Sequence, residues 1–304
     1  MKGKVISVFG GSGFLGCYLI RELLKLGAHI KVFSRTPEKA LDLKTQAKLG
    51  QLELHRIDIT KIDSIKEAIN GSDTIINLIG IRSGSSKQLF TTHVLFPKLL
   101  AKCAKLANIP HLIHFSTIGV ERNYESSYAH SKYEGDQCVH NENPKSVILR
   151  PGLVFGQNDH FLYRLYFSMI KLPFFVTSNN HKSIKPIHAS AIVNLVFDIL
   201  NHYQKYQGKI INITGNKDYS IQEVLQMLEQ VIGKRINILS LPGIAYKLYS
   251  SFFKLLPRPI MDKEQAHLLK YHYSDSFLKN HLKADQIQDK DLESFIFADL
   301  GRKS

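Results

Sequence analysis

Two residues suited to proton transfer, Tyr128 and Lys132, stand four positions apart in the sequence. On a helix this spacing places both side chains on one face. A nearby ammonium favours the phenolate and lowers a phenol pKa that starts near ~10. The pair therefore suits a tyrosine that acts as an acid or base, activated by the lysine. The alternative is that the pair only clamps a ligand's sugar and performs no turnover.

A glycine-rich run near the amino terminus is suited to holding phosphate. The apolar stretch 5–9 is followed by Gly10, Gly11, Ser12, Gly13, Phe14, Leu15 and Gly16, and then by a helical apolar pattern. In such a strand–turn–helix, Gly10 permits the tight turn, Gly13 lets a pyrophosphate approach bare backbone, and Gly16 brings helix against strand. The first N–H groups of the helix and its dipole then face the phosphates. The run predicts dinucleotide binding; the alternative is that the glycines only allow close packing.

The end of the next predicted strand, 29–33, indicates which dinucleotide is bound. It leads into Ser34 and Arg35, and the first acid comes only at Glu38. NAD-binding proteins place a carboxylate here on the adenosine ribose, whereas an arginine can hold a 2′-phosphate bidentately. We therefore expect NADP(H) in preference to NAD(H). The alternative is an ordinary surface arginine at a strand end.

Further candidate contacts to the cofactor come from the other predicted strands. Strand 52–57 delivers Asp58 and Ile59 towards the adenine. The other candidates belong to the ends of strands 74–79, 111–115 and 147–149, and are Leu78, Ile79, Gly80, Ser116, Pro151 and Val154, with Thr117 as a candidate catalytic hydroxyl. The carboxyl ends of parallel strands are where sheets of this kind bind ligands.

The elements that must position these residues alternate between strand and helix. Helices are expected at 64–69, capped by Asp63, at 90–107, and from Tyr128 onwards. Strand 74–79 is nearly all apolar, as a parallel strand covered on both faces requires. The order predicts an α/β fold with a doubly wound parallel Rossmann sheet.

After residue 155 the pattern changes to that of a smaller C-terminal α/β lobe. We place the NAD(P)-binding domain at 1–155 and the smaller partner or substrate lobe, intercalated with the sheet edge, at 156–284. A polar tail at 285–304 is expected to be loosely ordered.

Three features of the second half are specific enough to predict. A strand at 209–213 is expected to extend the sheet, and a capping box at Ser220 opens a helix over 221–232 that Gly233 ends. The segment 243–257 is expected to form a helix with a broad apolar face and lysines beside it. Such a face suits peripheral contact with a membrane or a partner's groove, and packing against the first domain is the alternative.

In combination these motifs resemble the short-chain dehydrogenase/reductase superfamily, in its extended or atypical branch. The resemblance rests on Gly10 to Gly16, Asp58, Asn77 to Gly80, Tyr128 to Lys132, and Arg150-Pro151 with Gly156. It implies a scaffold like that of NAD-dependent epimerases and dehydratases, a bound dinucleotide, and Tyr128 and Lys132 as the acid/base pair.

The second half narrows the resemblance. Leu241-Pro242, the aromatic and aliphatic helix after it, and Leu255-Leu256-Pro257 are similar to the subfamily that contains the NADPH-binding accessory subunit of respiratory complex I and its bacterial relatives. This resemblance implies a cofactor held for structure, a role in the assembly or stability of a complex, and links to ubiquinone biosynthesis.

One position departs from the superfamily's pattern. Active members carry Ser or Thr two places after the first serine beyond the fifth strand, and counting from Ser116 that place holds Ile118. Isoleucine cannot donate a hydrogen bond to a substrate carbonyl, and the loss of one such donor typically costs ~3 kcal/mol of barrier. Turnover therefore depends on whether Thr117 substitutes.

Three functions follow as hypotheses. The first is an NAD(P)H-binding accessory or assembly protein linked to respiratory complex I or ubiquinone metabolism. The second is an active NADP-dependent oxidoreductase or epimerase acting on a quinone precursor or lipid-linked sugar. The third is a regulatory protein that senses NADP(H) and signals to a partner.

Charge and composition restrict the partners and the compartment. The net charge of +14 is spread along the chain without interleaved aromatics, which argues against nucleic acid and suits an acidic partner or anionic lipid. Three scattered cysteines indicate a reducing compartment, and no cluster at ligand spacing indicates a metal. Since Met1 leads directly into a strand, we expect a cytoplasmic protein, with the inner face of the plasma membrane as its peripheral site.

Overall fold

The computed structural model describes residues 1–122, 126–171, 174–178, 183–235, 237–241, 281–283 and 290–301. The predicted helix at 243–257 lies outside these residues. None of the described helices is both long enough and apolar enough to cross a membrane.

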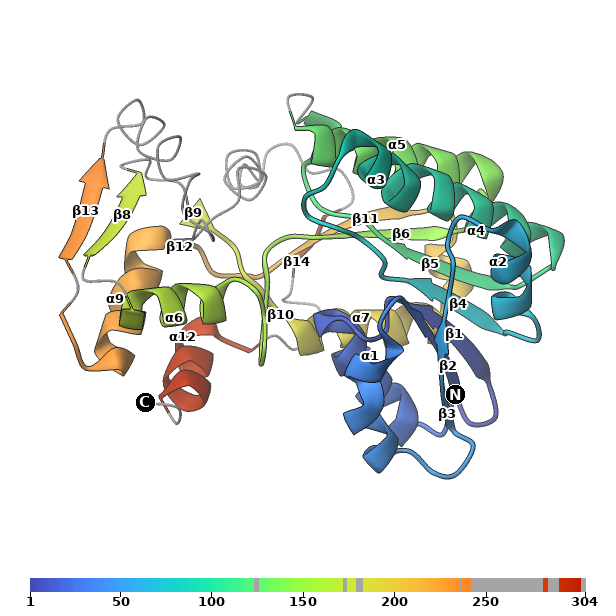
Figure 1. The fold of residues 1–304 in the computed structure, drawn as a ribbon, viewed down its shortest axis with the longest axis horizontal. Coiled ribbons are helices and arrows are strands. Elements are labelled where there is room, and N and C mark those ends of the chain that lie inside the picture. Colours follow the sequence, from blue (N-terminus) through green and yellow to red (C-terminus); the bar gives the residue numbers. More distant parts are fainter. Residues whose placement is uncertain are drawn as a thin grey trace.

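The centre of the fold is an eight-stranded sheet in the order β14-β11-β6-β5-β4-β1-β2-β3, in which every pairing is parallel (Figure 1). The chain runs outward from β1 to β3 on one side and from β4 to β6 on the other. A crevice opens above the carboxyl ends of the strands where the order reverses in such folds. The prediction of a doubly wound parallel sheet is confirmed. The strands are β1 (Val5–Phe9), β2 (His29–Ser34), β3 (Leu52–Arg56), β4 (Thr74–Asn77), β5 (His111–Phe115), β6 (Val147–Pro151), β11 (Ile210–Thr214) and β14 (His281–Lys283).

Helices cover both faces of the sheet because its strands are apolar on both sides. On one face lie α1 (Phe14–Lys25) and α7 (Ala189–Asn201), which Figure 1 shows below the sheet. Their apolar side chains belong to one hydrophobic cluster. On the other face α2 (Ile62–Ile69), α4 (Phe96–Leu106) and α5 (Ser127–Glu142) enclose another. Strand β11 pairs with β6, so the predicted extension of the sheet is confirmed.

Two predicted helices differ from the observed ones. The helix expected at 90–107 consists of α3 (Ser86–Phe90), a π-helical turn (Thr91–Leu95) and α4. Pro97 lies in the first turn of α4 and has no amide to donate to the carbonyl four residues earlier, so the regular ladder is interrupted there. Helix α2 begins at Ile62 with Lys61 as its N-cap residue, so the prediction that Asp63 caps this helix is wrong.

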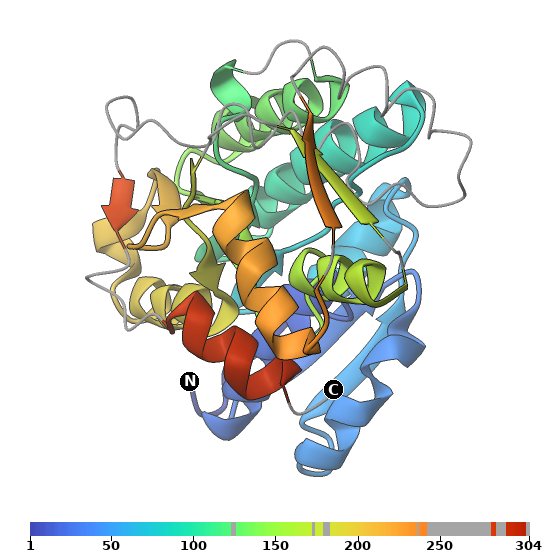
Figure 2. The ribbon, with the colours of Figure 1, turned by 90° about the vertical axis from the view of Figure 1, so that its left-hand side faces the viewer.

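A smaller lobe forms around a separate core. Helices α6 (Leu162–Lys171), α9 (Ile221–Ile232) and α12 (Leu292–Phe295), with the π-helical turn Ile296–Leu300, surround one apolar cluster (Figure 2). The capping box at Ser220 and a left-handed Gly233 bound α9, as predicted. The remaining strands are β7 (Val154–Phe155), β8 (Phe174–Ser178), β9 (Ser183–Ile184), β10 (Ile187–His188), β12 (Tyr219–Ser220) and β13 (Asn237–Leu241).

The described part of the carboxyl-terminal segment differs from the loosely ordered tail that its polar sequence indicates. Leu292, Ile296 and Leu300 are all buried in the core of the smaller lobe. Tyr219 donates to the Asp291 carboxylate at 2.6 Å, and Tyr163 donates to Asp299 at 2.6 Å. An apolar residue every fourth position was enough to complete this core. The boundaries at 155 and 284 stay predictions.

Candidate functional site

The glycine-rich turn between β1 and α1 has the geometry that a phosphate cradle requires. Gly10 adopts a φ of +80°, donates to Phe33 O at 2.8 Å and accepts from Gly13 N at 3.0 Å. A Cβ on Gly16 would lie 2.5 Å from Gly11 O, so only glycine lets α1 approach the turn this closely. The N-cap residue Gly13 has no side chain to occupy the first amides of α1. These amides and the helix dipole are therefore free to face an anion.

The loop that follows β4 packs against this turn. A Cβ on Gly10 would lie 3.0 Å from Ile79 N and from the carbonyl carbon of Leu78, so the backbone of the glycine turn directly contacts the backbone of the loop. The Ile79 amide donates to Asn77 Oδ1 at 3.0 Å. A Cβ on Gly80 would lie 3.3 Å from Lys132 Nζ. Loop 78–80 therefore lies between the glycine turn and the helix that carries the tyrosine and lysine.

Helix α5 presents Tyr128 and Lys132 as the sequence predicts. Its N-cap residue Ser126 accepts from Ala129 N at 3.1 Å, which fixes the first turn just where Tyr128 stands. Lys132 is 5% exposed and its Nζ donates to Phe115 O at 3.0 Å. Burial lowers the pKa of Lys132 to about 8, so the ammonium remains the main form at neutral pH.

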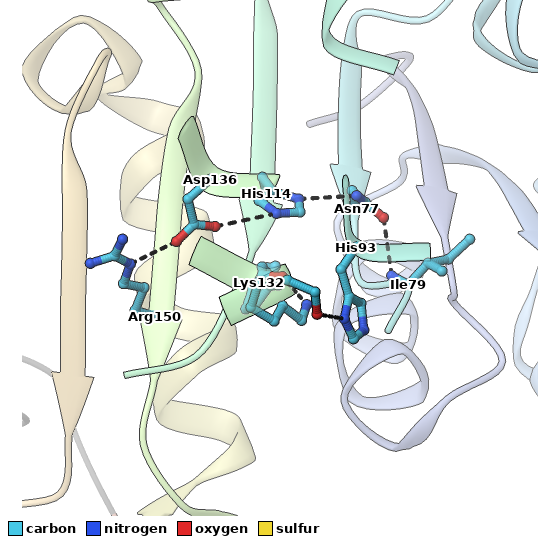
Figure 3. A network of polar contacts seen from close by, with 9 residues as sticks. Asn77, Ile79, His93, His114, Lys132, Asp136 and Arg150 are labelled. Carbon is cyan, nitrogen blue, oxygen red and sulfur yellow. Dashed lines mark hydrogen bonds and ion pairs between the residues drawn. The ribbon is translucent and has the colours of Figure 1, made fainter. Parts of the chain in front are cut away.

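A row of buried polar groups ties the ends of β4, β5 and β6 to α5 (Figure 3). Asn77 Nδ2 lies 3.0 Å from His114 Nδ1, and His114 Nε2 lies 3.6 Å from Asp136 Oδ1. Arg150 Nε donates to Asp136 Oδ2 at 2.8 Å. Burial, followed by the charge of Lys132, lowers the pKa of His114 well below its usual value, so the imidazole is neutral. The row holds Asn77, and through it the Ile79 amide, in a fixed place.

The residues expected at the adenosine end lie at the end of β2. Ser12 Oγ and Ser34 Oγ are 2.5 Å apart, and Ser34 Oγ accepts from Thr36 N at 3.2 Å. Arg35, next to Ser34 in the chain, is exposed. Glu38, the first acid after it, forms an ion pair with Arg56 at 3.1 Å. The Glu38 carboxylate therefore has Arg56 as a partner.

Two other groups of predicted residues take part mainly in local structure. Asp58 Oδ1 accepts from the amide and the hydroxyl of Thr60, at 3.0 and 2.6 Å, so it caps its own turn beside half-buried Ile59. These hydrogen bonds lower the pKa of Asp58. Val154 belongs to β7 and pairs with Ile187 of β10.

Ile118 and the two residues before it are buried and form hydrogen bonds with β6. Ile118 is completely buried and its amide donates to Pro151 O at 3.1 Å. The Thr117 hydroxyl also donates to Pro151 O, at 3.4 Å, and the residue is 8% exposed. The hydroxyl whose substitution for the missing donor was left open is therefore directed to the backbone of β6. Ser116, the first residue of this stretch, is buried and its amide donates to Leu149 O at 2.8 Å.

Sequence reasoning missed His93 and Ser131, which lie beside Tyr128. The His93 and Tyr128 rings meet edge to face, with centroids 5.3 Å apart and an interplanar angle of 87°. His93 Nδ1 lies 2.8 Å from Ser131 Oγ. The available signal was Pro97, which indicates a break in the helix that carries His93.

Residues 2–262 match the sequence profile of the NmrA-like family. The chain belongs to the NmrA-like family. It is 28% identical over 228 residues to NADH dehydrogenase (ubiquinone) 1 alpha subcomplex subunit 9, mitochondrial, of Dictyostelium discoideum, over 74% of this chain and 63% of that protein. It is 27% identical over 288 residues to the Mus musculus protein of the same name, over 90% of this chain and 73% of that protein. The chain thus spans less than two thirds of the Dictyostelium relative.

The fold of this NmrA-like chain also occurs in solved structures of reductases. Triphenylmethane reductase of Citrobacter sp., complexed with NADP(H), aligns with a TM-score of 0.74 at 18% identity, over 96% of this chain and 98% of that one. The described residues contain no group of three or more His, Cys, Asp or Glu side chains placed to bind a metal ion.

Proposed function

We propose that this protein is a nicotinamide-dinucleotide-binding accessory or assembly protein of a respiratory NADH–quinone oxidoreductase, and that it holds its cofactor mainly for structure. The observation that carries the proposal is the combination of a glycine turn shaped for a diphosphate with a buried isoleucine at the sequence position where active members of the superfamily carry Ser or Thr. Ile118 cannot donate from its side chain, and the Thr117 hydroxyl donates to Pro151 O. Without such a donor, charge developing on a substrate oxygen is not stabilised.

Residues Gly10 to Gly16 would hold the diphosphate of a bound dinucleotide, and loop 78–80 would line the middle of its site. Lys132 would bind the nicotinamide ribose in exchange for its bond to Phe115 O. A bound dinucleotide supplies a hydride donor or acceptor; the residues of this chain bind it, orient it and exclude water. In the relatives named subunit 9 of the 1 alpha subcomplex, a similar sequence is part of an NADH dehydrogenase, and this supports a respiratory complex as the partner.

NADP(H) is preferred over NAD(H) in this proposal. Arg35 is exposed at the end of β2, and the nearest following acid, Glu38, forms an exposed ion pair with Arg56. The Arg35 guanidinium is then available for bidentate contact with a 2′-phosphate.

The test is the melting temperature of the purified protein with NADPH and with NADH. Ligand at a hundred times its Kd stabilises the folded state by about 2.7 kcal/mol, so NADPH should raise the melting temperature by several degrees. Arg35→Ala should weaken NADPH binding about tenfold and leave NADH binding unchanged, because only the contact with the 2′-phosphate is lost. Arg235→Ala is the matched control, since it removes an exposed arginine just after α9, in the smaller lobe. If NADPH and NADH leave the melting temperature of the wild type unchanged, the proposal fails.

Attachment to a complex needs its own experiment. Native mass spectrometry of a gently solubilised membrane extract should report the chain bound to a respiratory assembly with one NADP(H). Detection of the chain only as a free, nucleotide-bound species would rule out the accessory role and leave dinucleotide binding standing. Segment 243–257, if it is the membrane or partner contact, should be protected from proteolysis only in that extract.

A second function, an active oxidoreductase or epimerase, is favoured by one observation. Tyr128 and Lys132 lie on one face of α5, and the Lys132 ammonium is buried with a pKa of about 8. This geometry suits proton transfer by Tyr128. Turnover on a quinone precursor or lipid-linked sugar that falls at least a hundredfold in Tyr128→Phe would establish this function; turnover unaffected by the substitution would exclude it.

A further inference from the structure

His93 links the loop after β4 to the helix that carries the tyrosine and lysine. Its ring is 1% exposed, and its Nε2 accepts from the Ile81 amide at 3.1 Å. A backbone amide only donates, so the ring proton is on Nδ1, 2.8 Å from Ser131 Oγ. Ser131 Oγ in turn donates to Tyr128 O at 2.8 Å. The three hydrogen bonds run in one direction, from the loop through His93 to α5.

The fold builds this link with an irregular turn. His93 lies in the π-helical turn Thr91–Leu95, and π-bulges within helices are frequent at functional sites. Pro97 cannot donate to the His93 carbonyl, which faces Gly135 of α5 instead: a Cβ on Gly135 would lie 1.8 Å from that oxygen. The backbone of α5 can therefore come close enough for the His93 ring to reach Ser131.

The imidazole stays in one protonation state at physiological pH. Burial, followed by the charge of Lys132, lowers the pKa of His93 to about 3. A protonated ring could not accept from Ile81 N, so the neutral form is the one that makes both bonds. His93 Nε2 is 3.7 Å and Lys132 Nζ is 3.3 Å from the place of a Cβ on Gly80, so both groups flank that glycine.

Loop 78–81 is thus held at two amides by side chains from different elements. Asn77 holds Ile79, and His93 holds Ile81. The first anchor belongs to the strand that the loop leaves. The second belongs to the layer that carries Tyr128 and Lys132, so it connects the loop to that pair through two side chains, His93 and Ser131.

We propose that His93 is a positioning residue of the dinucleotide site, which fixes loop 78–81 relative to Tyr128 and Lys132 so that both sides of the nicotinamide end are placed together. The inference rests on the proposed function, because the loop and the pair are there the two walls of the cofactor crevice. His93 acts through Ile81 and Ser131 and needs no contact with the cofactor itself.

Two substitutions separate the two hydrogen bonds. The side chain of His93→Gln places an oxygen near the position of Nε2 and can still accept from Ile81 N, whereas it loses the bond to Ser131. The side chain of His93→Asn places an amide nitrogen near Nδ1 and can still donate to Ser131, whereas it loses Ile81. His111→Gln is the matched control, since His111 lies at the amino-terminal end of β5 and stacks on Tyr203 with centroids 4.3 Å apart.

The experiment combines amide hydrogen exchange of the ligand-free protein with NADPH titration of the full chain. We expect the Ile81 amide to exchange about tenfold faster in His93→Asn and at the wild-type rate in His93→Gln and His111→Gln, because one hydrogen bond is typically worth a factor of this size. NADPH should bind about tenfold more weakly to His93→Asn and two- to threefold more weakly to His93→Gln. The fluorescence lifetime of the bound nicotinamide should shorten in both His93 variants, because a loosened crevice admits water, and should not change in His111→Gln.

The outcomes separate this inference from the proposed function. Wild-type protein that does not bind NADPH contradicts the proposed function, and the exchange of Ile81 then still decides whether His93 anchors the loop. Wild-type binding together with unchanged Ile81 exchange in His93→Asn overturns the role of His93 alone. An equal loss of affinity in all three variants also overturns it, since a general loss of stability explains that result. If His93→Asn does not fold, Ser131→Ala replaces it: we expect normal exchange of Ile81 and a shortened lifetime, and a wild-type lifetime contradicts the link to α5.

Discussion

At the scale of single residues, Arg150 shows how the site is held together. Asp136 is completely buried and accepts from Arg150 Nε at 2.8 Å, whereas Glu121, whose side chain is 29% exposed, accepts from Nη1 at 2.9 Å. Removing a partner from a buried ion pair leaves an uncompensated charge, which typically costs 3–5 kcal/mol. A partly exposed partner matters less because water replaces it.

Asp136→Ala should therefore lower the free energy of unfolding by about 3–5 kcal/mol, and Glu121→Ala by about 1 kcal/mol. Urea unfolding of the two variants side by side measures the difference. Equal losses would mean that Glu121 alone neutralises Arg150 and that Asp136 serves another group, such as His114 at 3.6 Å.

Residue types and spacing predicted part of the site. The glycine turn, loop 78–80, Tyr128 and Lys132 are adjacent in space because each belongs to the carboxyl end of a strand or the start of the helix after it. Local sequence could not predict that the Thr117 hydroxyl donates to Pro151, because that acceptor comes from a strand 34 residues later. His93 was missed for the same reason: both its partners lie outside its own helix.

At the scale of elements, the close approach of α5 to the π-helical turn Thr91–Leu95 depends on Gly135. A glycine inside a helix usually costs about 1 kcal/mol relative to alanine, so alanine is the favoured residue on propensity alone. Here a Cβ would lie 1.8 Å from His93 O, and that oxygen belongs to the backbone of a buried turn and cannot move aside cheaply.

Gly135→Ala should lower the free energy of unfolding by about 2 kcal/mol or more, because overpacking outweighs the gain in propensity. Gly152→Ala is the control, since its Cβ would meet Thr214 Cγ2 at an ordinary 3.4 Å. Thermal unfolding followed by circular dichroism measures both. Stabilisation by Gly135→Ala would show that α5 can shift away from the π-helical turn without cost.

The carboxyl-terminal helical segment supports a second prediction at this scale. Ile296 is completely buried in the core of the smaller lobe, and its neighbour Phe297 is 42% exposed. Ile296→Ala should destabilise the protein by about 2–5 kcal/mol, because it removes buried methyl groups and leaves a cavity. Phe297→Ala should change the free energy of unfolding by less than about 1 kcal/mol. Similar melting temperatures for the two variants would mean that this segment is not part of the folded core.

Periodicity predicted most elements of the sheet, and the misses have physical causes. Strands β1 to β6 were found because long apolar runs alternate with helical patterns. The carboxyl-terminal segment was not predicted, because one short apolar island, 295–297, among polar residues gives a weak pattern until a core is present to receive it. The π-helical turn at His93 was missed because helix propensities do not distinguish a π-helical turn from a regular helix. A single proline indicates that the helix is interrupted but not which irregular turn results.

At the scale of the whole molecule, α1 connects the glycine turn to the smaller lobe. Tyr18 on α1 accepts from Gln157 N at 2.6 Å and meets the His188 ring edge to face, with centroids 5.8 Å apart. His188 also contacts Phe155 and Phe295, from β7 and the carboxyl-terminal segment. A ligand that orders the start of α1 therefore also stabilises the contact between the two lobes.

Two buried histidines, His93 beside Tyr128 and His188 beside Tyr18, make the stability of the whole protein depend on pH. Burial lowers the pKa of His93 to about 3 and that of His188 to about 4. In the unfolded chain a histidine titrates near ~6.5, so below that pH the unfolded state binds protons that the folded state does not. Stability therefore falls as the pH falls from ~6.5, by about 1.4 kcal/mol per pH unit for each such histidine.

Asp159 opposes part of this loss. Burial raises its pKa to about 6, although its carboxylate accepts from Phe161 N and Leu162 N at 2.7 Å. Between about pH 6 and the ordinary aspartate value of ~3.9, the folded state holds a proton that the unfolded state has lost, so this group stabilises the fold as the pH falls. Its contribution offsets one histidine over that range. The histidines His93, His114 and His188 outnumber it.

The free energy of unfolding measured in urea should therefore decrease from pH 7 to pH 5, in the range of histidine titration and above that of ordinary carboxyl groups. His93→Gln lowers stability at every pH, but it also removes one proton-binding difference between the two states. Between pH 6.5 and pH 5, the free energy of unfolding of His93→Gln should fall by about 2 kcal/mol less than that of the wild type. This difference corresponds to about 1.5 pH units at about 1.4 kcal/mol per unit. His111→Gln, at a half-buried position, should follow the wild-type slope more closely. A His93→Gln profile parallel to the wild type would mean that His93 titrates normally in the folded protein, and the bond to Ile81 would then be lost in mild acid.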